Sequence, residues 1–195
     1  MPKLGNLSRK IKPVEITESE LSRISALSTP QAILALVQIP KKTDLNATKL
    51  ENLFLLALDG VQDPGNLGTI IRTADWFGLN TIICSMDTAE VYNPKVVQAS
   101  MGSLSRVNLI YTNLEDFFDQ TNIPVYGALL DGKSIYETNF GQEGIILLGN
   151  EGNGISTELQ SRINFPVTIP RYGKAESLNV AISASIFCSE LRRKS

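Results

Sequence analysis

The sequence predicts an α/β protein with a mostly parallel sheet and helices on both faces, preceded by a shorter N-terminal part. From about residue 50, apolar runs of strand length alternate with segments that repeat at helical spacing. Hydrophobic residues make up 43% of the 195 residues, which is enough for a substantial core. Ligands of such sheets bind at the carboxyl ends of the strands, so function is expected in the loops there.

Two domains are expected, residues 1–48 and 49–195. In the first, a short helix is predicted within 15–27, a strand at 31–39 and a polar linker at 40–49. This part holds seven Lys/Arg against four Asp/Glu, whereas the remainder holds eleven against sixteen. The charge therefore gives no global basic field of the kind that binds nucleic acid.

The second part is expected to alternate strands and helices in the following order. Strands are predicted at 52–61, 81–85, 124–130, 144–149 and 164–170, and helices at 66–78, 92–103, 114–120 and 177–193. The helix at 66–78 has a clear apolar periodicity and a stop signal at Gly78, and Asn66 is placed to cap its start. The order implies a sheet covered on both faces.

Several classes of protein are excluded or disfavoured by composition. The chain has no histidine, which removes Ser-His-Asp and Cys-His catalysis and histidine metal sites. Its two cysteines, Cys84 and Cys188, are far apart and form no metal-binding or disulfide pattern. No apolar run reaches the ~20 residues of a membrane span, and the N-terminus lacks the apolar region of a secretion signal. A cytoplasmic protein with no metal and no membrane is expected.

Three loops after expected strands have unusual sequences: DPGNLGTIIR (63–72), LLGNEGNGIS (147–156) and IPRYGKAESLNVAIS (169–183). The first matches neither the Walker A nor the G-x-G-x-x-G phosphate loop. Ordinary structural explanations exist for each. Arg72 could be a surface helix residue, the second loop a turn ending in a cap at Ser156 or Thr157, and Ser177 a helix cap.

Taken together and in order, the three loops resemble the signature motifs of the SpoU (TrmH-type) RNA 2′-O-ribose methyltransferases of the SPOUT superfamily. The resemblance runs through residues 50–193. The motifs are N-x-G-x-x-x-R, an apolar run into G-x-E-G, and I-P followed by S-L-N-V. The matching residues are Asn66, Gly68 and Arg72; Gly149, Glu151 and Gly152; and Ile169, Pro170, Ser177, Leu178, Asn179 and Val180.

The resemblance implies a parallel α/β sheet whose C-terminal segment threads a trefoil knot, one of the rare exceptions to unknotted topology. It also implies S-adenosylmethionine as cofactor, a homodimer packed through the knot and the C-terminal helix, and an RNA substrate, either rRNA or tRNA. The cofactor contacts that it implies are Gly149, Ile169, Leu178, Asn150 and Ala128.

For catalysis, the resemblance implies Arg72 as the group that activates the ribose 2′-OH. A guanidinium stays protonated with a pKa above ~12, which favours holding a phosphate and stabilising the developing alkoxide over acting as a base. Asn66 and Glu151 are expected to orient Arg72, and Ser177 and Asn179 to position the ribose or shape the third motif.

Two rival interpretations remain at this point: a non-catalytic RNA-binding or ribosome-assembly protein on the same fold, and a nucleotide-dependent Rossmann enzyme. Members of the family often carry an N-terminal RNA-selection domain, and residues 1–48 resemble only its end. We therefore expect a chain that binds S-adenosylmethionine and dimerises but methylates RNA weakly by itself.

Overall fold

The computed structural model describes residues 13–25, 27, 29–39, 50 and 52–193. The chain separates into two compact units, residues 1–41 and 42–195, each described by itself. The expected boundary between 48 and 49 and the expected linker at 40–49 fall outside the described residues. The assignment of residues 1–48 to an RNA-selection domain stays a prediction.

The N-terminal unit contains helix α1 (Glu18–Ile24), close to where the sequence predicted it. Its start is fixed by a capping box, in which Thr17 accepts from the Glu20 N–H and the Glu20 carboxylate accepts from the Thr17 N–H. The strand predicted at 31–39 is wrong, because this segment is irregular and Leu36 is 96% exposed. A strand needs a hydrogen-bonded neighbour, and none of the described strands pairs with this segment.

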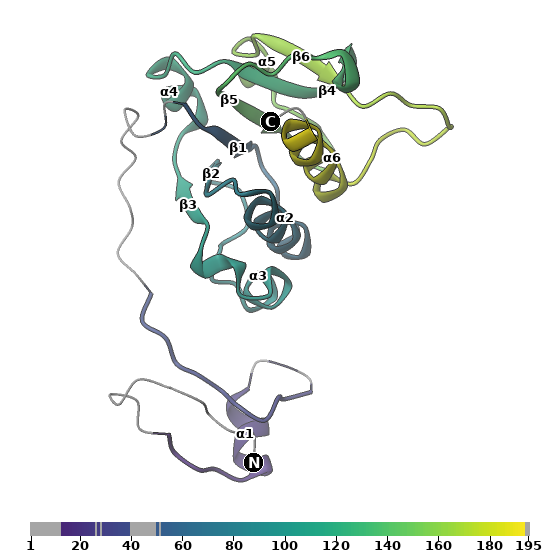
Figure 1. Ribbon diagram of the computed structural model, residues 1–195. Coiled ribbons are helices and arrows are strands. Elements are labelled where there is room, and N and C mark those ends of the chain that lie inside the picture. The colour runs from purple at the N-terminus through teal and green to yellow at the C-terminus, as the bar shows by residue number, and fades with distance from the viewer. Residues whose placement is uncertain (1–12, 26, 28, 40–49, 51, 194–195) are drawn as a thin grey trace. The chain divides into compact units, whose positions relative to one another are not determined.

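The second unit is built on one six-stranded parallel sheet in the order β3-β2-β1-β5-β4-β6 (Figure 1). The strands are β1 (Phe54–Leu58), β2 (Thr81–Cys84), β3 (Asn108–Tyr111), β4 (Val125–Ser134), β5 (Gly144–Leu148) and β6 (Phe165–Thr168). Leu58 at the end of β1 pairs with Cys84 of β2 and Leu148 of β5, so the carboxyl ends of the central strands are level. The edge strand β3 was not predicted from the sequence.

The helices are α2 (Pro64–Phe77), α3 (Pro94–Ser100), α4 (Leu114–Asp119), α5 (Thr157–Gln160) and α6 (Val180–Arg193), with 3₁₀ turns η2 (Ser103–Ser105) and η3 (Ile135–Glu137). They cover both faces of the sheet, as predicted. Helix α2 and helix α6 pack on one face, and α4 and α5 contribute to a separate apolar cluster on the other. The short helix α5 was not predicted, because four residues give no helical period to read.

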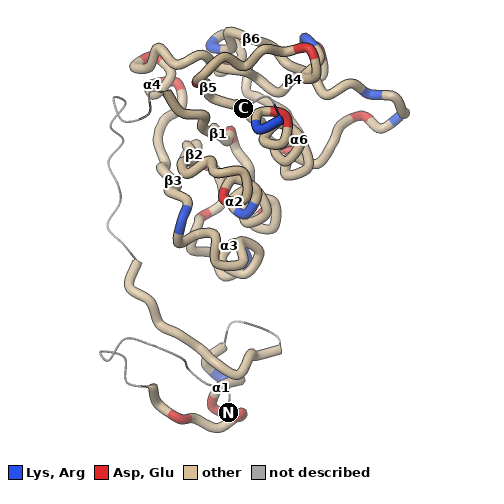
Figure 2. The backbone as a smooth tube through the Cα atoms, viewed as in Figure 1, with Lys and Arg blue, Asp and Glu red and all other residues tan. Residues whose placement is uncertain are grey.

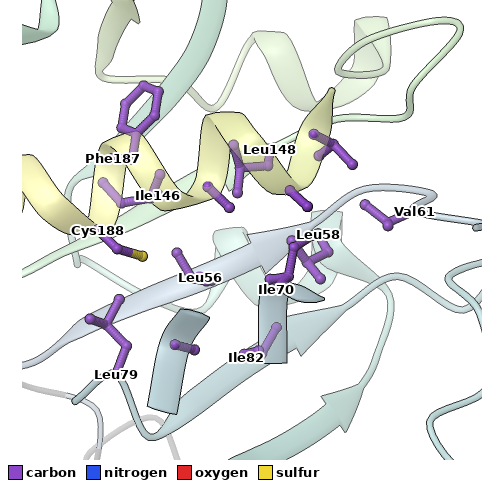
Figure 3. Packing of buried hydrophobic residues seen from close by; sticks show 14 of the residues in the cluster. Leu56, Leu58, Val61, Ile70, Leu79, Ile82, Ile146, Leu148, Phe187 and Cys188 are labelled. Atoms are coloured by element: carbon purple, nitrogen blue, oxygen red, sulfur yellow. The ribbon is translucent and has the colours of Figure 1, made fainter. Parts of the chain in front are cut away.

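The alternation of side chains along β1 explains how one strand serves two cores. Leu56 and Leu58 belong to the cluster under α2 and α6, whereas Leu55 and Ala57 belong to the cluster on the opposite face. Figure 3 shows the first cluster, with Leu56 of β1 and Phe187 of α6 among its labelled members. The central strands are therefore buried on both faces, as in other parallel sheets.

Helix α2 begins two residues earlier than predicted, and Asn66 is not its cap. Asp63 is the N-cap and accepts a hydrogen bond from the Asn66 N–H at 2.8 Å, with Pro64 at the first helical position. A short side chain that accepts hydrogen bonds, followed by proline, favours the start of a helix. Proline has no N–H, and at the first helical position an N–H would have no partner within the helix. The side chain of Asn66 is thereby left for another use.

The glycine of the first motif serves helix packing. A Cβ added to Gly68 would lie 2.5 Å from the Ala99 Cβ and 2.8 Å from the Val96 carbonyl oxygen, both in α3. The small residues of α6 also act within this chain: Ala181 and Ala184 are buried in the core, and the Ser185 hydroxyl lies 3.2 Å from that of Thr73 in α2. These small residues let α6 pack closely against α2.

Both cysteines are free thiols in the core, and burial raises the pKa of Cys188 to about 12. Among the described residues, no helix combines the length and the apolar character that crossing a bilayer would need.

Candidate active site

The three unusual loops lie at the carboxyl ends of neighbouring strands. The first follows β1 and leads into α2, the second (149–156) follows β5, and the third (169–179) follows β6 and leads into α6. Because β1, β5, β4 and β6 are adjacent and parallel, their following loops share one edge of the sheet (Figure 1). This is the edge at which ligands of such sheets bind.

A chain of side-chain hydrogen bonds joins all three motifs through Asn66. The Asn66 amide nitrogen donates to Glu151 Oε1 at 2.8 Å, and the Asn66 amide oxygen accepts from Asn179 Nδ2 at 3.0 Å. The Asn179 oxygen in turn accepts from the N–H groups of Ala181 and Ile182 and so caps α6. Asn179, rather than Ser177, is therefore the cap of the last helix, and both ends of its amide are used.

The second loop is anchored to the first by Asn150. Its Nδ2 donates to the Gly60 carbonyl at 2.7 Å, and its Oδ1 accepts from the N–H groups of Gly152 and Asn153. The backbone of Asn150 also forms a two-way bridge with Gly154. The side chain and the backbone of Asn150 are therefore both engaged in holding the second loop.

Two further contacts fix the second loop. The Ser156 N–H donates to the carboxylate of Asp59 at 2.7 Å. A Cβ on Gly149 would lie 2.1 Å from the carbonyl carbon of Gly154, so only glycine allows the loop to close on itself there. The loop is thus a fixed wall of the site. Neither cap considered for its end, Ser156 or Thr157, makes a side-chain capping bond to α5.

A cavity of about 500 Å³ opens between the second and third loops and the ends of β4, β5 and β6. Buried apolar side chains, Leu148, Val167 and Phe187, contribute to its lining. All five residues expected to contact a cofactor line it, together with two of the residues expected in catalysis. These seven are Ala128, Gly149, Asn150, Ile169 and Leu178, with Glu151 and Ser177.

The third loop brings to the cavity backbone N–H groups that have no partner among the described residues. No backbone N–H of residues 171–178 donates a hydrogen bond to the described part of the chain. All of these residues are exposed. An apolar floor with free backbone donors and acceptors above it suits a flat heteroaromatic ring whose polar edge is read by backbone groups.

Arg72 lies apart from the hydrogen-bonded chain. It is exposed on α2, and its side chain makes no hydrogen bond or ion pair with any described residue. The expected orientation of Arg72 by Asn66 and Glu151 is not present, because Asn66 is occupied by Glu151 and Asn179. Ser177 is exposed at the cavity and makes no side-chain hydrogen bond with the described residues.

The sequence reasoning missed the two aspartates of the first loop. Asp63 caps α2, and Asp59 holds the second loop through Ser156. An Asp-Pro pair before a helical period is a recognisable start signal and could have identified Asp63. No local pattern announces Asp59, because its partner is 97 residues away in sequence.

The fold and the cavity define a parallel α/β protein that binds a ligand across the carboxyl ends of β4, β5 and β6. Comparison with known proteins gives the family. The sequence pattern of the SpoU rRNA Methylase family matches residues 53–189, and the chain belongs to this family. The recognition made from the three motifs is confirmed.

Among curated proteins, the 23S rRNA (guanosine(2553)-2′-O)-methyltransferase RlmP of Bacillus subtilis is 35% identical over 192 residues, covering 96% of this chain and 75% of the relative. A solved structure from Porphyromonas gingivalis, assigned to the TrmH family of RNA methyltransferases, has a TM-score of 0.83 and 48% identity, with 93% of this chain and 74% of that chain covered.

A second solved structure is that of the SpoU methyltransferase AviRb from Streptomyces viridochromogenes in complex with AdoMet. It has a TM-score of 0.82 and 27% identity, and the match covers 95% of this chain and 75% of that one. These similarities confirm the predicted fold class, that of the SPOUT methyltransferases. The trefoil knot is implied by that fold.

Proposed function

We propose that this chain is an S-adenosylmethionine-dependent RNA methyltransferase that transfers a methyl group to a ribose 2′-OH of rRNA or tRNA. The observation that carries the proposal is the joining of the three motifs at one cavity through Asn66, Glu151 and Asn179. A binding protein on the same fold would have no need of this arrangement beside an exposed arginine. The relatives named as 2′-O-methyltransferases support the same reaction.

The residues around the cavity fit the cofactor. The apolar floor suits the adenine ring, and the free backbone N–H groups of residues 171–178 suit its polar edge and the ribose. Gly149, Ile169 and Leu178 would hold it through their backbone, and the carboxylates of Glu151 and Glu176 give negative charge at the lining of a site for a sulfonium cation. When bound, S-adenosylmethionine supplies a methyl group already activated by the positive sulfur.

The protein's own contribution is to hold and polarise the acceptor. Arg72 has no partner among the described side chains, so its donors are available for an RNA phosphate and for the alkoxide that develops at the 2′-oxygen. Ser177, exposed at the cavity, would hold the ribose, and Asn179 would shape the third motif. Holding the oxygen in line with the methyl carbon provides much of the remaining rate.

The assembly proposed for this activity is a homodimer in the cytoplasm. Ile182 of α6 is 51% exposed on a helix whose other side is buried in this chain, so it offers an apolar contact to a second copy. The proposal includes the expectation that this chain methylates RNA weakly by itself, since the described residues 50 and 52–193 carry no broad basic field (Figure 2).

The test combines binding and transfer. Calorimetric titration with S-adenosylmethionine, and separately with NAD and ATP, should show binding of S-adenosylmethionine only. Transfer of labelled methyl groups into 23S rRNA and tRNA transcripts should then occur, and Arg72→Ala should lower its rate by about 10²- to 10³-fold while cofactor binding is kept.

Cofactor binding without transfer to any RNA, by wild type and by Arg72→Ala alike, would instead favour the non-catalytic protein. Label found on a base rather than on ribose would contradict the proposed acceptor.

A further inference from the structure

The third loop carries an aromatic side chain that the chain itself does not cover. Tyr172 is 94% exposed, although it lines the cavity in which the cofactor is proposed to bind. Within the described residues, its ring contacts no other aromatic ring and its hydroxyl makes no hydrogen bond. A large ring held in water at the rim of a site is a surface that a ligand can cover.

Two basic residues flank Tyr172 in the sequence. Arg171 directly precedes Tyr172, and Lys174 follows two positions later, with Gly173 between them. The Arg171 guanidinium donates one hydrogen bond to the Ala175 carbonyl at 3.2 Å, and its remaining donors have no partner among the described residues. Figure 1 shows the segment between β6 and α6 extending away from the sheet, and Figure 2 shows basic residues along it.

An exposed ring flanked by cations matches the chemistry of single-stranded nucleic acid. Bases of any sequence stack on an aromatic face, and arginine and lysine neutralise the neighbouring phosphates. RNA read in single-stranded segments is held in this way, with its bases splayed out onto aromatic side chains.

We propose that Arg171, Tyr172 and Lys174 form an RNA-contact surface at the rim of the cofactor cavity, on which a base next to the methylated ribose stacks against Tyr172. This surface would place the 2′-OH over the cavity, and Arg171 and Lys174 would hold the flanking phosphates. The inference rests on the proposed function, because it names the part of the chain that meets the RNA of that reaction.

If a base stacks on residue 172, RNA binding requires an aromatic ring at that position. Tyr172→Phe keeps the π-face and loses only the hydroxyl, whereas Tyr172→Leu keeps an apolar side chain and loses the π-face. A fluorescein-labelled single-stranded RNA of about 20 nucleotides, longer than one small single-strand site, serves as the probe. We expect Tyr172→Phe to bind it like wild type and Tyr172→Leu to bind it about 5- to 100-fold more weakly.

The contribution of Arg171 and Lys174 can be separated from stacking by the salt dependence of RNA binding. Arg171→Gln and Lys174→Gln should each reduce the slope of log Kd against log salt by about 0.7, the value for one phosphate on a single strand. Tyr172→Leu should weaken binding and leave the slope unchanged. Tyr92→Leu changes a tyrosine that is 37% exposed and does not line the cavity, and it should leave both quantities unchanged.

Calorimetry with S-adenosylmethionine and the oligomeric state are measured on the same variants. Equal RNA binding by wild type and Tyr172→Leu would overturn the inference. So would a loss of cofactor affinity in Tyr172→Leu with RNA affinity intact, because Tyr172 would then cover the cofactor. A shift from dimer to monomer would assign the ring to a second copy. Absence of methyl transfer by the wild type, with these binding results unchanged, would instead count against the proposed function.

Discussion

The loops after β5 and β6 face the same cavity but are held in opposite ways. The second loop, residues 149–156, is tied to the loop after β1 by Asn150 and Asp59 and is closed on itself at Gly149. The third loop, residues 169–179, is exposed from 171 to 179 and is joined to the rest of the site by the Asn179–Asn66 hydrogen bond at its end. One wall of the cavity is fixed in advance, and the other has backbone groups to offer a ligand.

The difference indicates a division of work. A fixed wall lowers the cost of placing the cofactor and Glu151, because little has to be ordered on binding. The exposed third loop has free N–H groups that can donate hydrogen bonds to a bound ligand. It can also present Tyr172 to RNA. Four substitutions test this comparison through stability, from the largest expected effect to the smallest.

Gly149→Val should have the largest effect, because its side chain would start 2.1 Å from the carbonyl carbon of Gly154 and backbone must move. We expect a loss of about 3 kcal/mol or more in the free energy of unfolding, measured by urea denaturation. Gly173→Val is the matched control in the other loop, since nothing lies within 4 Å of a Cβ there. Equal destabilisation by the two variants would remove the contrast between the loops.

Asn150→Ala removes three hydrogen bonds that hold the second loop, those with Gly60, Gly152 and Asn153. We expect a loss of about 2–3 kcal/mol, at roughly 1 kcal/mol for each net hydrogen bond, and weaker binding of S-adenosylmethionine by calorimetry. A variant as stable as wild type would mean that the loop is held by something other than this side chain.

Asn66→Ala breaks the hydrogen-bonded chain that ties the two loops together. Its partners Glu151 and Asn179 are both exposed, so water can replace the lost contacts and the cost should be only about 1 kcal/mol. The rate of methyl transfer should fall more than the affinity for S-adenosylmethionine, since the hydrogen bonds of Asn66 hold in place groups proposed to act on the acceptor. An unchanged rate would mean that the joining of the three motifs through Asn66, on which the proposed function rests, is not needed for methyl transfer.

Lys174→Ala should have the smallest effect on stability, within about 0.5 kcal/mol of wild type, because Lys174 is exposed and its side chain has no partner among the described residues. The same change should weaken RNA binding. Amide hydrogen exchange offers a direct check in the wild type, because residues 171–178 should exchange early and Gly154, paired with Asn150, later. Slow exchange across residues 171–178 would show that the third loop is held after all.

Much of this arrangement could be predicted from local sequence. Local patterns predict β1, β5 and β6 from their apolar runs and α2 from its helical period. A strand buried on both faces and an amphipathic helix each require a recognisable pattern over a few neighbouring residues. The three motifs identify the family. The family resemblance in turn predicted Gly149, Ile169 and Leu178 as cofactor contacts, and these residues line the cavity.

Other features depended on partners that no local pattern reveals. The apolar segment at 31–39 has the composition of a strand but pairs with no described strand, whereas β3, shorter and more polar, becomes one because β2 offers it an edge. Asn66 looked like a helix cap and proved to join the three motifs, because Asp63 had already taken the capping position.

The sequence by itself therefore determined the class of fold, the family and the identity of the residues that surround the cavity, since these are written in short spacings and apolar periods. Only the tertiary structure decided what each polar side chain does. Asn66 finds Glu151 85 residues away and Asn179 113 residues away, and Asn150 finds Gly60 90 residues away. A hydrogen bond is made by whichever groups the sheet brings within about 3 Å, and the parallel order of β1, β5, β4 and β6 sets that proximity.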